Sequence, residues 1–147
     1  MSNVNKTGRT KGKERFICLP HYLMDTVAWG RLSVTARAAW LEYMRRHNGS
    51  NNGRIAMPER NLADRLGISR NTANRAIKEL LTFGFIEVTR GASFAGKRIA
   101  VEYLLTHLPD DRTTPKGAPS RAFQNVGKPR LRTLHQAQNL SGIRRKF

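Results

Sequence analysis

The chain has 147 residues, which predicts one domain with a modest core plus appendages and is too short for a large enzyme. Its 27 Lys and Arg residues outnumber 10 Asp and Glu residues, so the formal net charge is +17 and a polyanionic partner is the first hypothesis. A basic ribosomal-type protein and a protein that binds the membrane surface are the alternatives at this level.

Residues 1–15 are predicted to form a basic, disordered arm. They lack the apolar stretch of a secretory signal, and no later segment approaches ~18 consecutive apolar residues. We therefore expect neither export nor membrane insertion. Cys18 is the only cysteine, which predicts no internal disulfide and a reducing compartment such as the cytoplasm. We expect Cys18 to be a small apolar residue of the core.

A short helix is predicted at residues 21–29, after an apolar stretch that precedes Pro20. Its apolar side chains would face inward at Leu23, Met24 and Val27. Gly30 is expected to end it.

Ser33 is a suitable N-cap for a second helix that runs through about His47, since apolar residues recur there with a period of 3.6. Trp40 and Leu41 are expected in the core. The other aromatic residues of this region lie on apolar faces at helical spacing, so they too are predicted to be core residues rather than platforms for stacked bases: Phe16, Tyr22, Trp29 and Tyr43.

A loop rich in turn-forming residues follows, and residues 54–56 predict a minimal strand. Pro58 suits the first turn of the next helix, where its missing N–H costs nothing. Leu62, Ala63 and Leu66 form an apolar stripe on that helix. Gly67 can then supply the left-handed conformation of a tight turn.

A further helix is predicted from Arg70 to Phe83, capped by Ser69. Apolar residues at helical spacing would face inward, namely Ala73, Ile77, Leu80 and Leu81. An amphipathic surface helix also has a polar outer face, but such a face usually mixes charges. This one has three cations, two asparagines and no acid before Glu79, which favours DNA contact because arginine can pair with guanine and asparagine with adenine. The outer residues are Arg70, Asn71, Asn74, Arg75 and Lys78.

Two segments in which apolar and polar residues alternate follow this helix and predict a β-hairpin. Ile86 and Val88 share one face of the first run, and Ile99, Val101 and Tyr103 share one face of the second. The hairpin would cover the core even without DNA, and its tip would also reach a flanking phosphate or the minor groove. The basic residues near that tip are Arg90, Lys97 and Arg98.

Residues 109–147 are predicted to be a basic, mostly disordered tail, because they are rich in proline at the start and lack a sustained apolar period. They hold nine basic and two acidic residues, a net charge of +7, whereas residues 1–15 carry +4 and residues 16–108 carry +6. Most of the excess charge therefore lies in the two ends. A solvated tail and an arm that binds phosphates are both left open.

The segment LADRLGISRNTANRAIKELLTFGFIEVTRG resembles the winged helix-turn-helix module of bacterial transcription regulators, particularly the GntR type, over roughly residues 58–91. The chain is also similar to small winged-helix proteins of bacterial phages, plasmids and integrative elements. The resemblance implies a winged helix-turn-helix domain at residues 16–108, a wing beside the DNA groove, and DNA contacts by Ser69, Arg70, Asn71, Thr72, Asn74 and Arg75.

Two features depart from the family pattern. Met57 and Pro58 replace the usual Ser or Thr cap before the first motif helix. A basic tail follows the module where a GntR regulator has an effector-binding domain, which argues against a sensor of metabolites.

The sequence predicts no catalytic residues, no metal site and no cofactor. The four histidines lack metal-ligand spacing, and Cys18 with His21 would supply at most two ligands. Gly-rich phosphate loops and Ser/His/Asp constellations are not found in the sequence, and the acidic residues are few and scattered.

The sequence therefore predicts a mainly α, α+β protein with a small β-hairpin that binds double-stranded DNA in the cytoplasm, at the nucleoid. Transcriptional repression, in a mobile element, is the leading hypothesis. An accessory factor for replication initiation, partition or recombination is the first alternative, and an RNA-binding or structural protein is the second. A homodimer and a protein partner for the C-terminal tail are left open.

Overall fold

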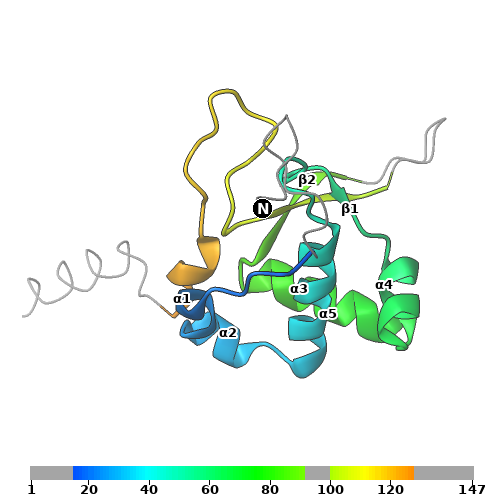
Figure 1. The fold of residues 1–147 in the computed structure, drawn as a ribbon. Coiled ribbons are helices and arrows are strands. Elements are labelled where there is room, and N and C mark those ends of the chain that lie inside the picture. Colours follow the sequence, from blue (N-terminus) through cyan, green and yellow to red (C-terminus); the bar gives the residue numbers. More distant parts are fainter. Residues whose placement is uncertain (1–14, 92–99, 128–147) are drawn as a thin grey trace, which may run out of the picture.

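The computed structural model describes residues 15–91 and 100–127, which form an α+β fold with a small three-stranded antiparallel sheet (Figure 1). The predicted N-terminal arm up to residue 14, the predicted tip residues Lys97 and Arg98, Ile99, and the tail from residue 128 lie outside these ranges. The elements are α1 (His21–Met24), α2 (Val27–Arg31), α3 (Val34–Arg46), β1 (Ile55–Ala56), α4 (Glu59–Leu66), α5 (Arg70–Thr82), β2 (Ile86–Arg90), β3 (Glu102–Leu105) and the 3₁₀ helix η1 (Ala122–Asn125).

Two short helices replace the single helix predicted at residues 21–29. α1 ends at Met24, and Thr26 begins α2 because its hydroxyl accepts a hydrogen bond from the Trp29 N–H at 3.1 Å. The same hydroxyl donates to the Leu23 carbonyl at 2.7 Å, which closes the end of α1. Gly30 does not end the helix, since α2 continues through Arg31. The sequence did not predict that Thr26 ends one helix and begins the next.

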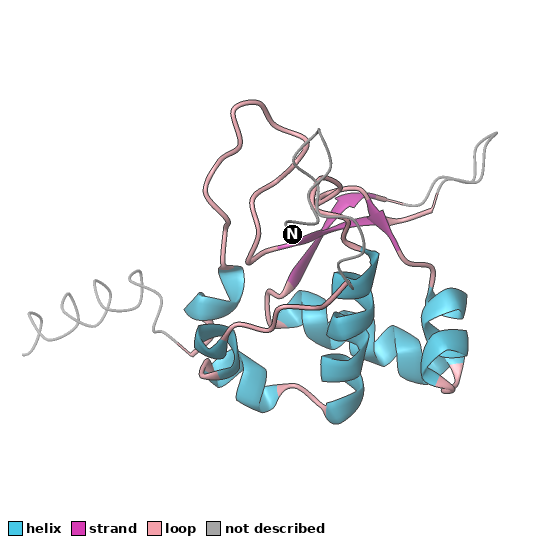
Figure 2. Ribbon diagram, in the orientation of Figure 1, coloured by secondary structure: helices cyan, strands magenta, loops and turns pink. Residues whose placement is uncertain are grey.

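The three longer helices begin and end close to the predicted residues. Ser33 caps α3 by accepting from the Ala36 N–H at 3.1 Å, and Ser69 caps α5 in the same way. α3 packs against α5 and α4 (Figure 2). None of the helices in the described ranges is long and apolar enough to cross a membrane.

The core is built around a chain of aromatic contacts. Trp29 meets Trp40 edge to face with ring centroids 5.6 Å apart, and it meets Phe85 at 5.7 Å. Tyr43 packs edge to face on Tyr103 at 5.3 Å, so the helices and the sheet share one core. The prediction that Trp29, Trp40 and Tyr43 are buried is confirmed. Such pairs add about 0.5–1.5 kcal/mol beyond the area that they bury.

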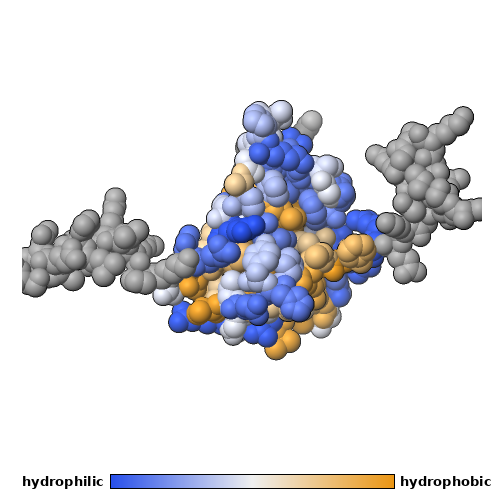
Figure 3. All heavy atoms as spheres, turned by 60° about the vertical axis from the view of Figure 1, so that its left-hand side comes forward, coloured by the Kyte–Doolittle hydropathy of each residue, from blue (hydrophilic) through white to orange (hydrophobic). Residues whose placement is uncertain are grey.

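Several residues predicted in the core lie at the surface instead. Phe16 is 85% exposed, and residues 15–20 carry no helix or strand that would turn it inward. Leu41 is 38% exposed because one position along a helix from Trp40 is roughly 100° around the axis. On the face drawn in Figure 3, apolar side chains form patches between hydrophilic ones. The remaining wrong core predictions are Cys18, Tyr22, Met24 and Val27, all of which are exposed.

The strand order in the sheet is β1-β3-β2, with both pairs antiparallel. β3 lies in the centre, so Tyr103 is opposite Ile55 on one side and Val88 on the other. The pairing of β2 with β3 shifts between Val88 and Arg90. The predicted pairing of two strands after α5 is confirmed, although the second strand begins at Glu102 rather than near residue 99.

The packed chain does not end at residue 108, where the sequence placed the domain boundary. η1 brings Phe123 back into the core, where it is fully buried and stacked on Phe85 with centroids 5.0 Å apart. Gly84 makes this approach possible, because a Cβ there would lie 2.9 Å from the Ala122 backbone carbon. The prediction of a mostly disordered tail from residue 109 is therefore wrong for residues 109–127. The sequence did not predict this burial, because a single phenylalanine among prolines and polar residues shows no helical or strand periodicity.

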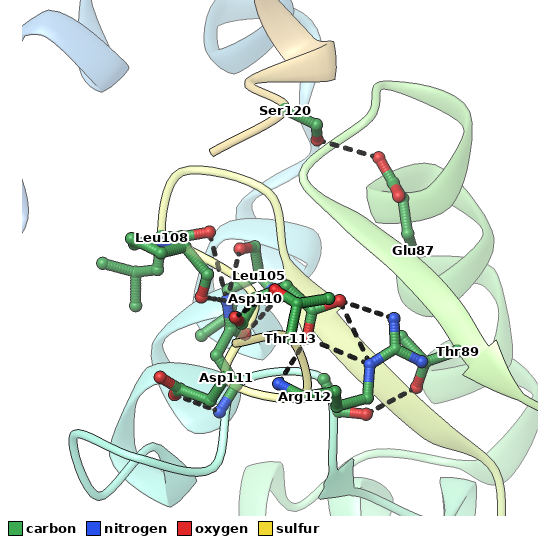
Figure 4. A network of polar contacts seen from close by, with 12 residues as sticks. Glu87, Thr89, Leu105, Leu108, Asp110, Asp111, Arg112, Thr113 and Ser120 are labelled. Carbon is green, nitrogen blue, oxygen red and sulfur yellow. Dashed lines mark hydrogen bonds and ion pairs between the residues drawn. The ribbon is translucent and has the colours of Figure 1, made fainter. Parts of the chain in front are cut away.

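A polar network ties the start of this segment to the loop before β1 (Figure 4). The buried Asn52 amide donates to the carbonyls of Leu105, Leu108 and Pro109 at 3.0, 3.2 and 2.8 Å, and its oxygen accepts from the Leu105 N–H at 2.7 Å. Asp111 accepts from the Asn52 backbone N–H at 2.8 Å. The Lys116 ammonium pairs with Asp111 and lowers the pKa of that carboxyl. The Asn52 side chain thus holds residues 105–109, and its backbone holds Asp111.

Candidate nucleic-acid interface

The turn between α4 and α5 sets the direction of α5, the helix that is predicted to contact DNA. Gly67 adopts φ 64° and ψ 36°, the left-handed conformation that the sequence predicted. The Ile68 N–H donates to the Ala63 carbonyl at 3.0 Å, which closes α4. Ile68 packs against the core in the corner between the helices. The helix pair around Gly67 is therefore held by local hydrogen bonding and by the packing of Ile68.

The predicted outer residues of α5 lie together on one side of that helix. Ala73, Ala76, Ile77 and Leu80 are buried on the opposite side. Because successive residues are about 100° apart, Asn71, Asn74, Arg75 and Lys78 share the outward side, and Arg70 lies at the exposed first turn. No carboxylate of the described residues forms an ion pair with Arg70, Arg75 or Lys78.

Ser69 and Thr72 hold the N-terminus of α5 rather than projecting freely. The Ser69 hydroxyl accepts from the Thr72 N–H at 3.1 Å, and the two hydroxyls are 2.8 Å apart. Both residues lie at the positive end of the helix dipole, where the free N–H groups attract phosphate. Their contribution to binding would therefore come through the backbone of the first turn as much as through their side chains.

Asn74 has a partner that the sequence did not indicate. Its amide nitrogen donates to Glu59 of α4 at 2.5 Å, across 15 residues of sequence. The amide oxygen and the second N–H stay available, and these are the two groups with which asparagine recognises adenine. Glu59 lies in the first turn of α4, at the positive end of the helix dipole. The structure also makes it a positioning residue for Asn74.

The one acid of α5 is turned away from the outer face. The Glu79 carboxylate accepts from the Ser33 backbone N–H at 2.9 Å, at the N-terminus of α3. An acid near a helix N-terminus is favourable because of the helix dipole. This contact explains why Glu79 can stand directly after Lys78 without diminishing the positive charge of the outer face.

Arg90 is the only residue of the predicted hairpin tip in the described part of the chain. It lies at the end of β2 and forms an ion pair with Glu102 at 3.7 Å, and its side chain stays half exposed. A surface pair of this length contributes little, about 0–1 kcal/mol, so Arg90 can exchange Glu102 for a phosphate. The structure places Arg90 at the sheet end and leaves Lys97 and Arg98 outside the described residues.

The arrangement presents a helix with two amides, its N-terminal N–H groups and three cations that form no ion pair with an acid of the described residues. It fits a polyanion with hydrogen-bonding groups in a groove wide enough for a helix. No protein-family model, curated protein or solved structure matches the chain.

Proposed function

We propose that the chain is a winged helix-turn-helix protein that binds double-stranded DNA sequence-specifically and represses transcription, with α5 in the major groove. The observation that carries the proposal is the outer face of α5, on which Arg70, Asn71, Asn74, Arg75 and Lys78 lie with no acid of α5 among them. Repression by occupying a promoter requires binding alone, so no sensor is needed.

The order of the elements supports this proposal. Two helices joined at the left-handed Gly67 are followed directly by the antiparallel strands β2 and β3, as the resemblance to winged helix-turn-helix modules implies. β2 begins four residues after α5 ends, and Arg90 at the far end of that strand is the residue that would contact a flanking phosphate.

Mapping the bound sites across the genome of the native host tests the regulatory role. Sites at promoters would support it, whereas confinement to a single origin or attachment array would replace it with a role in replication or recombination. Competition between a duplex DNA and an RNA of matched sequence tests the ligand. Tighter binding of the RNA would contradict the proposal.

Replacing Arg70 or Asn74 with alanine is expected to cost about 1–3 kcal/mol on the preferred site and to relax specificity at one base position. Each substitution would remove a contact with a base edge that the preferred site offers and random DNA does not. Quantitative binding to the preferred site and to its single-base variants measures the effect. Arg31→Ala removes an exposed cation of α2 and serves as the control. Equal losses on preferred and random DNA would argue against base reading.

Ending the chain after Gly127 is expected to weaken binding to all DNA sequences alike and to flatten its salt dependence. Residues 128–147 hold six basic and no acidic residues. Each phosphate neutralised contributes about −0.9 to the slope of log K against log salt, so the slope should fall by up to about 5. The whole segment from residue 109 is not removed, since that cut would delete the buried Phe123. An unchanged slope would show that the tail does not contact DNA.

A further inference from the structure

A groove lies beside the C-terminal end of α3, where residues 15–17 run next to that helix and Arg65 of α4 closes one side. Its volume is about 1000 Å³. A smaller hollow of about 450 Å³ adjoins it and shares Arg15 and Arg45. The groove is lined chiefly by arginines and apolar residues, together with a histidine and an asparagine; the residues used below are Arg15, Arg45, Arg65, Phe16, Ile17 and Met44.

The arginines of the groove are held in place but remain accessible. Arg15 donates to the His47 carbonyl at 3.3 Å. Glu42 is the acid of the described residues that pairs with this cluster, contacting Arg65 closely and Arg45 at 3.8 Å. Since the Arg45 side chain is 66% exposed, one carboxylate leaves most of the positive charge of the groove uncompensated.

Two of the three apolar residues that line the groove are exposed, whereas the third, Met44, packs against the core. Phe16 and Ile17 are at the surface, and the exposed Leu41 lies outside the groove lining, one turn before Arg45 on the same side of α3. Side chains of this kind rarely stay in water as a group unless they contact something. A ligand for this groove must therefore supply both negative charge and apolar groups.

The groove lies on the side of α3 that faces away from α5. Tyr43 is buried in the core, and Arg45 and Leu41 are two residues from it, roughly 200° around the helix axis. In Figure 1, α3 crosses in front of α5, against which it packs. A duplex on the outer face of α5 would leave the groove free.

We propose that this groove binds an acidic segment of a partner protein whose carboxylates alternate with apolar side chains. Carboxylates pair with arginine in a fork geometry, and apolar side chains of the segment would cover Phe16 and Ile17. A nucleic-acid backbone brings charge but no apolar side chains. A second copy of the chain would bring another large positive charge to a positive surface, which is repulsive.

A labelled synthetic peptide of alternating Glu–Leu and Asp–Phe units tests the inference by fluorescence anisotropy with the full chain. The chain attracts any acidic peptide through its net charge, so the comparison is between two variants of equal charge. Arg45→Glu is expected to weaken peptide binding about tenfold or more. Arg31→Glu, an exposed arginine of α2, is expected to weaken it less than about threefold because screened, distant charges contribute little.

Equal losses in the two variants would overturn the inference. Phe16→Ser should also weaken binding, and a peptide with Gln and Asn in place of its acids should bind no better to the wild type than to Arg45→Glu. Circular dichroism melting confirms that the variants fold. If Arg45→Glu weakened duplex DNA binding and left peptide binding intact, the groove would be a phosphate site and the inference would be wrong. The inference does not rest on DNA binding by α5. Arg75→Ala tests that binding separately, by anisotropy with a labelled DNA duplex in place of the peptide.

Discussion

Replacing Phe123 with alanine is expected to lower the free energy of unfolding by about 3–5 kcal/mol, the usual cost of removing a buried aromatic side chain. Phe123 is fully buried and stacked on Phe85, which in turn contacts Trp29. The loss would leave a cavity at the point where η1 meets α2 and the end of α5. Urea denaturation followed by tryptophan fluorescence measures it, since both tryptophans lie in this core.

Gln124→Ala is the matched control, because Gln124 is exposed in the same short helix. Its effect should stay within about 0.5 kcal/mol, as for most surface substitutions. If Phe123→Ala unfolded at the same urea concentration as the wild type, residues 109–127 would not belong to the cooperative domain. The predicted boundary at residue 108 would then stand in solution.

Lowering the pH from 7 to 4 is expected to destabilise the protein by roughly 3 kcal/mol through His107 alone, at 1.36 kcal/mol for each unit of pKa difference. Burial lowers the pKa of His107 from 6.5 to about 4, and the charges of His47 and Arg121 act in the same direction. Both ring nitrogens lack a hydrogen-bond partner in the described residues, and the ring packs on Trp40 at 5.2 Å.

The direction of the effect follows from which state binds the proton. The unfolded chain protonates His107 near pH 6.5, whereas the folded chain resists protonation until about pH 4. Stability is therefore full above pH 6.5, falls between these values and levels off below them. The pKa of Asp110, lowered chiefly by its hydrogen bond from Arg112, and that of Asp111 affect stability mainly below about pH 4, at the acid end of this window.

Urea denaturation at several pH values between 7 and 4 tests this prediction. His107→Leu should remove most of the pH dependence in this window while the protein stays folded, because no hydrogen bond of the described residues is lost. His21→Gln, at an exposed position, is the control and should keep the dependence of the wild type. A slope that persists in His107→Leu would rule out His107 as its origin.

The outer face of α5 followed from sequence because it depends on local rules. Ser69 caps a helix, and Gly67 takes a left-handed conformation. Residues three or four positions apart share a side of a helix, so Arg75 and Lys78 lie together and away from Ile77. The contact from Asn74 to Glu59 did not follow, since it joins two helices across a turn whose angle is set by packing. The same holds for Glu79 at the N-terminus of α3.

The sequence by itself determined the helices from α3 to α5, the paired strands after them and the outer polar face of α5. Each is specified by residues close in the chain, through caps, turns and apolar period. Tertiary structure alone decided that Thr26 divides the first helix, that Phe16 and Leu41 face outward, and that Phe123 returns to the core. Those outcomes depend on which surfaces meet in space, and one apolar residue in a polar, proline-rich segment gives no periodic signal of the partner that will bury it.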